Sequence, residues 1–284
     1  MIKLGIIGIS EGNGHPYSFS AIINGFNEEE FKTSNWQGIY EYLKKRDKVD
    51  FGICDVKVSH VWTQNIEESR KIARCSYVES VVENFEDMID EVDGVIIARD
   101  DYETHLKFAK PFLEAGKYVF IDKPLSLNKE ELTYFKSFIE KKQLFSASGI
   151  KYAVELDEIR SLDNKDFKFI RATCIKNWDK YGIHMLDGIF SVVDWEVKEV
   201  EKKDNIYVLK CKNDRIMEIC MLGSYNQPIF KFEFFGDKYY QVEIKDYFMA
   251  FKRLLLHFVD MIINEKQDTS KTIELMEILI KGLK

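Results

Sequence analysis

The N-terminal stretch MIKLGIIGISEGNGHP (residues 1–16) decides the fold of the first half of the chain. Its apolar residues Ile2, Leu4, Ile6, Ile7 and Ile9 form a short run that leads into a glycine-rich turn, as in a buried parallel strand. Pro16 suits the first position of a helix. Apolar residues then follow at the i, i+3, i+4, i+7 spacing of one helical face, at Phe19, Ile22, Ile23 and Phe26. The stretch therefore predicts a strand, a glycine turn and a helix.

The pattern repeats over the next hundred or so residues. We expect a second strand at 49–54 that ends at Asp55, and further strands at 94–98 and 118–121, with helices between them. The polar residues 27–48 are interpreted as an insertion that is partly helical from about Trp36. This alternation predicts an α/β domain over residues 1–123 with a Rossmann-type, doubly wound parallel sheet.

The second half changes character from about residue 167. Strand-like runs lie close together and are separated by hairpin-type turns, at 167–176, 206–212, 216–222, 229–235 and 239–244. We expect residues 124–284 to form an α+β domain with a mostly antiparallel open sheet. Its helices at 247–263 and 271–283 are predicted to pack back towards the first domain. The alternating Phe230, Phe232 and Phe234 predict an aromatic sheet face and a homodimer or homotetramer.

Composition narrows the class of protein. The 284 residues carry a net charge of −7 without a basic stripe, which argues against a nucleic-acid partner. The 5 cysteines include no CxxC pair, so we expect no metal site and no disulfide; Cys54 and Cys220 suit an apolar core. No run of 18 apolar residues and no secretory leader pattern occur, which favours a cytoplasmic protein without membrane contact.

The glycine turn is the first candidate site. Backbone N–H groups of such a turn can approach a pyrophosphate at the start of a helix, which singles out Gly8, Ser10, Gly12 and Asn13. The usual spacing would place glycine at positions 10 and 13. A flexible loop without a ligand is the alternative interpretation.

Asp55 is the second candidate. A carboxylate at the end of the second strand accepts hydrogen bonds from ribose hydroxyls and repels a 2′-phosphate, so we expect NAD in preference to NADP. Its distance from Gly12 exceeds the usual spacing of about 20 residues, which the insertion would explain. A plain surface aspartate is the alternative.

Two further groups carry chemistry. Asp122 and Lys123 follow the strand at 118–121, where open α/β sheets bind ligands. His184 and Asp187 share one helical face, so the carboxylate could orient the imidazole. An HxxD pair of this kind also occurs as a simple surface pair.

Together these motifs resemble the Gfo/Idh/MocA family, the glucose–fructose oxidoreductase and inositol dehydrogenase group. The matching stretches are the glycine turn, GICD (52–55), VDGVIIA (92–98) followed by His105, EAGKYVFIDKPLS (114–126), GIHMLD (182–187) and FKRLLLHFVDMIINEKQ (251–267). The resemblance implies a Rossmann domain followed by a domain with an open antiparallel sheet. It also implies that Lys123 and His184 are catalytic.

The chain departs from the family pattern at several positions. Asp122 replaces the family's glutamate, and Arg99 with Asp100 replaces its proline beside the nicotinamide. Lys180 stands where the family usually has an aspartate four residues before the histidine. Arg99 and Asp122 are nevertheless expected in the cofactor site.

The leading hypothesis is a nicotinamide-dependent oxidoreductase that transfers hydride to or from a hydroxyl or ketone carbon of a sugar, cyclitol or sugar derivative. Lys123 would bind the reacting oxygen, and His184 would exchange the proton. Lys151 and Tyr152 are the candidates for substrate binding. A non-catalytic regulator or scaffold that binds a dinucleotide or sugar nucleotide is the main alternative. Hydrolysis or elimination assisted by retained NAD is a third.

Overall fold

The computed structural model describes residues 1–53, 55–163, 166–224, 228–266 and 271–283, so Cys54 lies outside the described residues. The chain divides into two compact units, Met1–Ser146 with Leu255–Thr269, and Ala147–Leu254 with Ser270–Lys284. The sequence analysis placed the boundary after Lys123. The first unit extends further because β6 (Leu144–Phe145) pairs with the preceding strand of its sheet.

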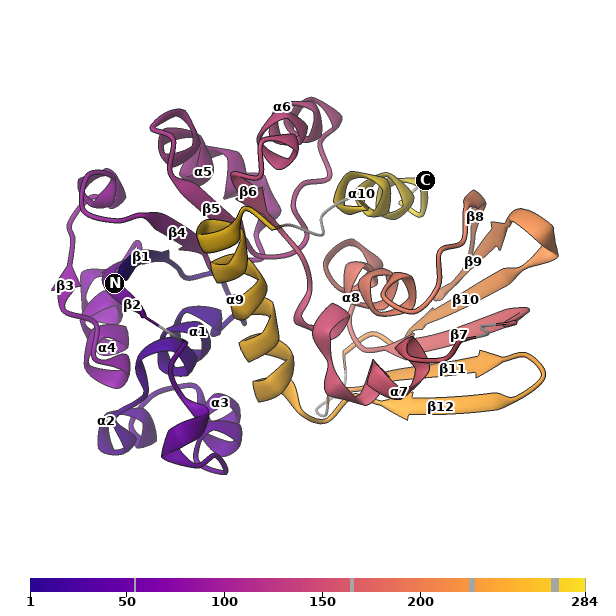
Figure 1. Cartoon of the computed structure of the whole chain (residues 1–284), viewed down its shortest axis with the longest axis horizontal. Helices are drawn as coiled ribbons and strands as arrows, with labels where there is room; N and C mark the ends of the chain where they lie inside the picture. Colours follow the sequence, from indigo (N-terminus) through magenta and orange to yellow (C-terminus); the bar gives the residue numbers. More distant parts are fainter. Residues whose placement is uncertain (54, 164–165, 225–227, 267–270, 284) are drawn as a thin grey trace. The chain divides into compact units, whose positions relative to one another are not determined.

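The first unit is built on a parallel sheet (Figure 1). Its strands are β1 (Ile2–Ile7), β2 (Val56–Trp62), β3 (Ser80–Val81), β4 (Gly94–Ile97), β5 (Tyr118–Ile121) and β6. They lie in the order β3-β2-β1-β4-β5-β6, and every described pairing among them is parallel. This confirms the predicted Rossmann-type sheet. The strand order reverses between β1 and β4, which is where such sheets bind ligands, beyond the carboxyl ends of the strands.

Helices cover both faces of this sheet, with α1 on one side and α5 and α6 on the other (Figure 1). The helices of the unit are α1 (His15–Asn24), α2 (Glu28–Lys32), α3 (Gln37–Leu43), α4 (Ile66–Ser76), α5 (His105–Glu114), α6 (Lys129–Glu140) and the second half of α9 (Tyr247–Asn264). Helices α2 and α3 belong to the predicted insertion. Short 3-10 turns lie at Lys48–Asp50, Phe85–Met88 and Tyr102–Thr104.

Aromatic packing holds α1 and α9 against the sheet. The ring of Phe120 in β5 lies 5.8 Å from Phe19 of α1 and 5.7 Å from Phe258 of α9, centroid to centroid. Phe258 also stacks on Phe145 of β6 at 6.3 Å. Each of these rings is almost completely buried, so the late helix α9 completes the core of a unit formed mainly by the first half of the chain.

The second strand does not lie where the sequence analysis placed it. Residues 48–50 form a 3-10 turn and Val49 is 87% exposed, so this stretch is not a strand. The strand is β2, whose sequence VKVSHVW alternates apolar residues with the half-buried Lys57 and His60. Asp55 therefore precedes the strand instead of ending it, and its carbonyl accepts a hydrogen bond from Ile2 N at 2.7 Å.

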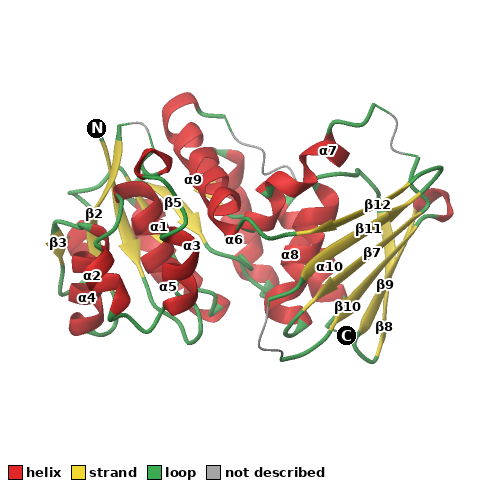
Figure 2. Cartoon of the chain, turned by 90° about the horizontal axis from the view of Figure 1, so that it is seen from below, coloured by secondary structure: helices red, strands yellow, loops and turns green. Residues whose placement is uncertain are grey.

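The second unit is built on a mixed, mostly antiparallel sheet, as predicted (Figure 2). Its strands are β7 (Phe169–Cys174), β8 (Val197–Lys203), β9 (Ile206–Cys211), β10 (Ile216–Met221), β11 (Phe230–Phe235) and β12 (Tyr239–Glu243), in the order β12-β11-β7-β10-β9-β8. Within this second sheet, β7 and β10 pair in parallel and the other described pairings are antiparallel. The unit also contains the first half of α9 and three further helices, α7 (Asp157–Arg160), α8 (Trp178–Phe190) and α10 (Thr272–Lys281). Its 3-10 turns lie at Gly149–Tyr152, Val154–Leu156 and Lys212–Asp214.

The aromatic face of β11 is used inside this unit. Phe230, Phe232 and Phe234 are buried, and Gly188 of α8 lets the Phe232 ring approach so closely that a Cβ on Gly188 would lie 2.5 Å from it. The face that the sequence analysis offered to a partner subunit therefore packs on α8. The opposite face of the sheet carries a separate row of apolar residues that are paired across four strands, Ile216, Phe169, Phe235 and Tyr239.

Candidate active site

The polar residues of the first unit gather where β1, β4 and β5 end. These strands are neighbours in the sheet, so the loops that follow them meet at one edge. The glycine turn follows β1, Arg99 and Asp100 follow β4, and Asp122 with Lys123 follows β5. The sequence analysis predicted most of these residues, but it did not predict Asp100, Gln64 or His15 as parts of the site.

The glycine turn is closely folded at its ends and open at its centre. A side chain on Gly8 would place its Cβ 2.3 Å from the ring of Pro16, so only glycine fits there. Gly12 has a positive φ of 73° and open space around the position of a Cβ. The backbone at Gly12 is thus accessible to a ligand. The loop around it is closed by a hydrogen bond of 3.1 Å from Asn13 N to Ser10 O.

Ser10 and Asn13, which stand where glycine is usual, have structural partners of their own. The Ser10 hydroxyl donates to Asp100 Oδ1 at 2.7 Å. The Asn13 amide donates to Asp122 Oδ2 at 3.0 Å, and its Oδ1 accepts the His15 N–H at 2.9 Å. The two replacements therefore connect the glycine turn to the carboxylates that follow β4 and β5.

Asp122 has hydrogen-bond partners on both of its carboxylate oxygens. His15 Nδ1 lies 2.6 Å from its Oδ2, and the Lys123 N–H donates to Oδ1 at 2.9 Å. Burial alone raises the pKa of Asp122, but the charges of His15 and Lys123 and the hydrogen bonds from His15 and Asn13 outweigh it and lower the pKa below its ordinary value. Asp122 is therefore ionised at neutral pH despite its burial.

Lys123 lies between two carboxylates. Its Nζ is 3.6 Å from Asp122 Oδ2 and 4.0 Å from Asp100 Oδ2, and only 5% of its side chain is exposed. A buried ammonium is costly unless charged partners compensate it. The sheet edge thus holds one preorganised cation beside the topological switch point.

Arg99 and Gln64 close the side of the cluster towards β2. Arg99 donates to Asp101 at 2.9 Å and to Gln64 Oε1 at 3.0 Å. Gln64 in turn accepts from Ile9 N at 3.1 Å and donates to Ile9 O at 2.7 Å. Gln64 lies just beyond the end of β2, the position at which the sequence analysis had expected Asp55.

Asp55 is not part of this cluster, and its expected role in ribose binding is corrected. It precedes β2, so it lies at the opposite edge of the sheet from the strand ends. Its carboxylate is 75% exposed and pairs with the N-terminal amine at 2.7 Å. The discrimination between NAD and NADP therefore cannot rest on Asp55.

His105 ties two of the loops together. Its Nδ1 lies 3.0 Å from Leu125 O and its Nε2 lies 3.0 Å from Arg99 O. Burial lowers the pKa of His105, although its contacts with the two backbone carbonyls oppose that effect. A neutral imidazole can donate from only one nitrogen at a time, so one of the two contacts is left without a proton. The residue positions the segments that carry Arg99 and Lys123.

The second unit holds His184 in a chain of contacts with Ser148. The Ser148 hydroxyl lies 2.5 Å from His184 Nδ1, and the Ser148 N–H donates to Asp187 Oδ2 at 2.6 Å. The sequence analysis expected Asp187 to orient the imidazole directly. The Asp187 carboxylate accepts the Ser148 N–H, and the Ser148 hydroxyl reaches the ring. Rings of Tyr181 and Phe230 flank His184 at centroid distances of 4.8 and 5.3 Å.

The two candidate substrate residues lie just after Ser148, in the 3-10 turn Gly149–Tyr152. The Lys151 ammonium lies 5.6 Å from the centroid of the Tyr152 ring. Tyr152 is buried and Lys151 is half-buried. Both residues follow closely after Ser148, which contacts His184. Their role in substrate binding remains a proposal.

Among the described residues, no cluster of three or more His, Cys, Asp or Glu side chains is arranged to hold a metal ion. No helix in the described part of the chain is both long and apolar enough to cross a membrane.

The parallel sheet with the order 3-2-1-4-5-6, a glycine turn after its first strand and ligand-type side chains at its switch point define a dinucleotide-binding protein of the Rossmann class. Comparison with protein families extends this conclusion. Residues 2–149 match the family model described as an oxidoreductase family with an NAD-binding Rossmann fold, the Gfo/Idh/MocA family. The chain belongs to this oxidoreductase family, whose members bind NAD.

Solved structures with the same fold cover nearly the whole chain. A myo-inositol 2-dehydrogenase from Lactobacillus plantarum is 15% identical with a TM-score of 0.74, over 99% of this chain and 96% of that one. A scyllo-inositol dehydrogenase from Lactobacillus casei, solved with NAD(H) and scyllo-inositol, is 17% identical with a TM-score of 0.67, over 99% and 94%. A UDP-N-acetylglucosamine 3-dehydrogenase from Acidithiobacillus ferrooxidans is 13% identical with a TM-score of 0.68, over 99% and 96%. A comparison with curated protein sequences gave no match.

Proposed function

We propose that the protein is an NAD(P)-dependent dehydrogenase or reductase that acts on a hydroxyl or ketone carbon of a sugar, cyclitol or sugar derivative. The observation that carries the proposal is the buried Lys123 ammonium between Asp100 and Asp122 at the carboxyl edge of the parallel sheet. The substrate class is supported by the inositol and nucleotide-sugar dehydrogenases that share the fold.

The residues at the sheet edge fit a dinucleotide. The backbone at Gly12 is open to a ligand, as close approach to a pyrophosphate requires. Gly8, Ser10 and Asn13 shape the turn, and Arg99 with Asp122 would line the nicotinamide side. When bound, NAD would supply the acceptor or donor of the hydride. The protein's part is orientation and electrostatics.

Lys123 would hold the reacting oxygen. An ammonium directed at that oxygen stabilises the negative charge that develops on it during hydride transfer. Asp100 and Asp122 would hold the ammonium in place, because each places a carboxylate oxygen 4.0 Å or less from Nζ.

His184 would exchange the proton. In the oxidative direction it takes the hydroxyl proton of the substrate as the hydride leaves the carbon, and in the reductive direction it returns that proton. Ser148 contacts Nδ1 at 2.5 Å, and Nε2 would be the nitrogen that exchanges the proton with the substrate. Asp187 supports this arrangement through the backbone of Ser148.

A non-catalytic dinucleotide or sugar-nucleotide binder of the same fold is the second candidate. It is favoured by Ser10 and Asn13, which stand in the turn where glycine is usual. Such a protein would bind the dinucleotide but would not need Lys123 and His184.

Replacement of Lys123 separates the two candidates. NAD affinity would be measured by calorimetry, and turnover by nicotinamide absorbance with a panel of inositols, sugars and nucleotide sugars. Loss of one preorganised donor typically costs about 100–1000-fold in turnover, so Lys123→Ala should lose most activity and keep NAD affinity within a few fold. Equal turnover by wild type and variant would refute the assigned role. NAD binding without turnover on any of the panel would favour the binder.

A further inference from the structure

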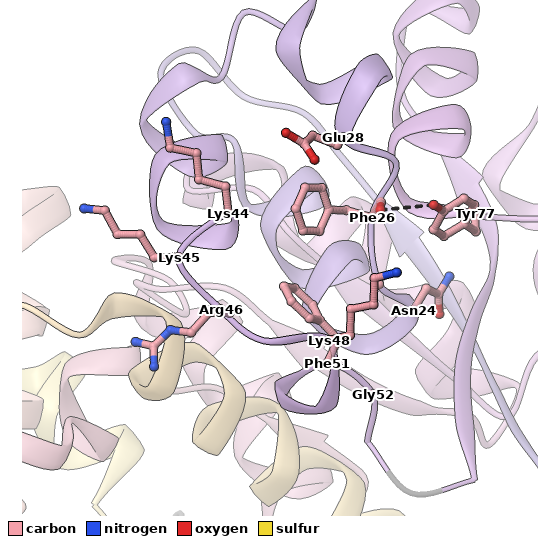
Figure 3. Close-up of a pocket in the computed structure, with 11 residues that line it drawn as sticks. Asn24, Phe26, Glu28, Lys44, Lys45, Arg46, Lys48, Phe51, Gly52 and Tyr77 are labelled. Carbon is pink, nitrogen blue, oxygen red and sulfur yellow. Dashed lines mark hydrogen bonds between the residues drawn. The ribbon is translucent and has the colours of Figure 1, made fainter.

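A second pocket lies in the first unit, away from the strand ends described above (Figure 3). It is a cavity of about 890 Å³ where α1 ends and the insertion rejoins the sheet. Its lining comes from the end of α1 through the start of α2, from the segment 44–52 and from Tyr77. Helix α1 separates it from the glycine turn, and at about 1.5 Å per residue a helix of 10 residues spans roughly 15 Å.

The floor of the pocket is aromatic and locally rigid. The rings of Phe26 and Phe51 contact each other at a centroid distance of 5.4 Å. Tyr77 donates its hydroxyl to Phe26 O at 3.1 Å, which holds its ring beside them. Gly25 and Gly52 have positive φ angles of 84° and 91°, and these turns bring the two phenylalanines together. The Tyr77 side chain is largely exposed, and both phenylalanines are half-buried, so ring surface remains for a ligand.

The rim of the pocket is basic. Lys44, Lys45 and Arg46 lie on one side, and Lys48 turns its ammonium towards Asn24 on the other (Figure 3). The one acidic residue of the lining is Glu28, whose carboxylate is already bonded to the Tyr40 hydroxyl at 2.8 Å and to Lys32 at 3.2 Å.

Lys45 and Lys48 are the cations most available to a ligand. Lys44 is engaged with Glu41 at 2.6 Å and lies over the Tyr40 ring. For Lys45 and Lys48, the described part of the chain shows no ion pair, and both side chains are exposed. Four basic residues around one pocket are a local departure from a chain whose net charge is −7.

We infer that this pocket binds a nucleoside phosphate at a site separate from the dinucleotide site. The basic rim suits phosphate oxygens, which lysine and arginine bind by charge-assisted hydrogen bonds. The aromatic floor suits the planar base, which stacks on rings. The volume lies within the range of about 300–1,000 Å³ that is typical of small-molecule sites. Free phosphate would contact the basic rim alone. An amphipathic anion such as a fatty acid would contact the rings through its chain but would not stack on them.

The test is a calorimetric titration of the full chain with ADP in the presence of saturating NAD. We expect one ADP per chain, with an affinity that falls as the salt concentration rises because the rim charges are exposed. Lys45→Glu with Lys48→Glu should weaken ADP binding at least tenfold. The matched control, Lys129→Glu with Lys136→Glu on α6, makes the same change of charge at exposed lysines outside the pocket and should stay within twofold.

A second variant tests the aromatic floor. Phe51→Leu keeps the site apolar but removes a ring, so it should weaken ADP and leave inorganic pyrophosphate unchanged. The inference is overturned if wild type binds no ADP at millimolar concentration, if NAD displaces the bound ADP, or if both lysine pairs lose affinity equally. Tighter binding of octanoate than of ADP would also overturn it. NAD affinity is measured on the same variants and should not change, which keeps this test independent of the proposed dehydrogenase activity.

Discussion

Ser148→Ala removes the hydroxyl that contacts His184 Nδ1 at 2.5 Å and that accepts the Ile150 N–H at 3.1 Å. Ser148 and His184 are both buried, so the imidazole loses a partner that water does not readily replace. A buried polar group left without its partner costs about 1–3 kcal/mol. At about 1.4 kcal/mol per factor of ten, that corresponds to roughly 5–150-fold.

We expect this loss in kcat, because Ser148 holds the proton-exchanging ring and does not itself contact the substrate oxygen in the proposed mechanism. The upper bound is the whole contribution of a general acid–base, about 100–10,000-fold, which His184→Ala should approach. KM should change by only a few fold. Ser148→Thr retains a hydroxyl and should restore most of the activity. The readouts are kcat and KM over a range of pH, since a freed imidazole also changes the pH profile.

Ser191→Ala is the control that distinguishes the positioning role of Ser148 from a general loss of stability. Ser191 follows α8, donates to Gly188 O at 2.7 Å and accepts from Arg160 at 3.2 Å, so its replacement also removes two hydrogen bonds in the same unit. It does not contact His184 in the described structure. If Ser191→Ala lowers kcat as much as Ser148→Ala does, or if Ser148→Ala has wild-type kcat and pH profile, the positioning role is wrong.

Three further predictions follow from the geometry. Asp55→Ala should leave the ratio of NAD to NADP dissociation constants within twofold of wild type by calorimetry, because the carboxylate is exposed and lies at the other sheet edge. The pKa of Asp122 is lowered in the folded state, so the ionised carboxylate stabilises the folded protein fully above its unfolded pKa of about 3.9. That contribution is lost as the pH falls through the lower folded pKa. Urea unfolding should therefore show that Asp122→Asn loses less stability than wild type below about pH 4. A homo-oligomer should be held together by the outer sheet face with its row of Ile216, Phe169, Phe235 and Tyr239. Sedimentation should show wild type as at least a dimer and Phe235→Lys as a monomer. A monomeric wild type would refute this prediction.

Local patterns were sufficient to predict the parallel sheet. Buried parallel strands are mostly apolar, so β4, β5 and the buried end of β1 could be recognised from sequence, as could the glycine turn between β1 and α1. β2 could not, because its Lys57 and His60 are only half-buried near the edge of the sheet and interrupt the apolar run. Because of that single error, Asp55 was predicted at the end of a strand, although it lies just before one. The predicted ribose contact depended on that position.

The contacts of His184 show a different limit. Helical spacing predicts that His184 and Asp187 share a face, but it does not say which groups of the unit lie against that face. Ser148 is far from both in sequence and becomes their neighbour only when the segment after β6 meets α8. Because the Asp187 carboxylate accepts the Ser148 N–H, replacing Asp187 should act on His184 through a backbone shift of Ser148. Asp187→Asn keeps an oxygen that can accept that N–H, so it should retain more activity than Asp187→Ala, whereas equal losses in the two variants would favour direct contact.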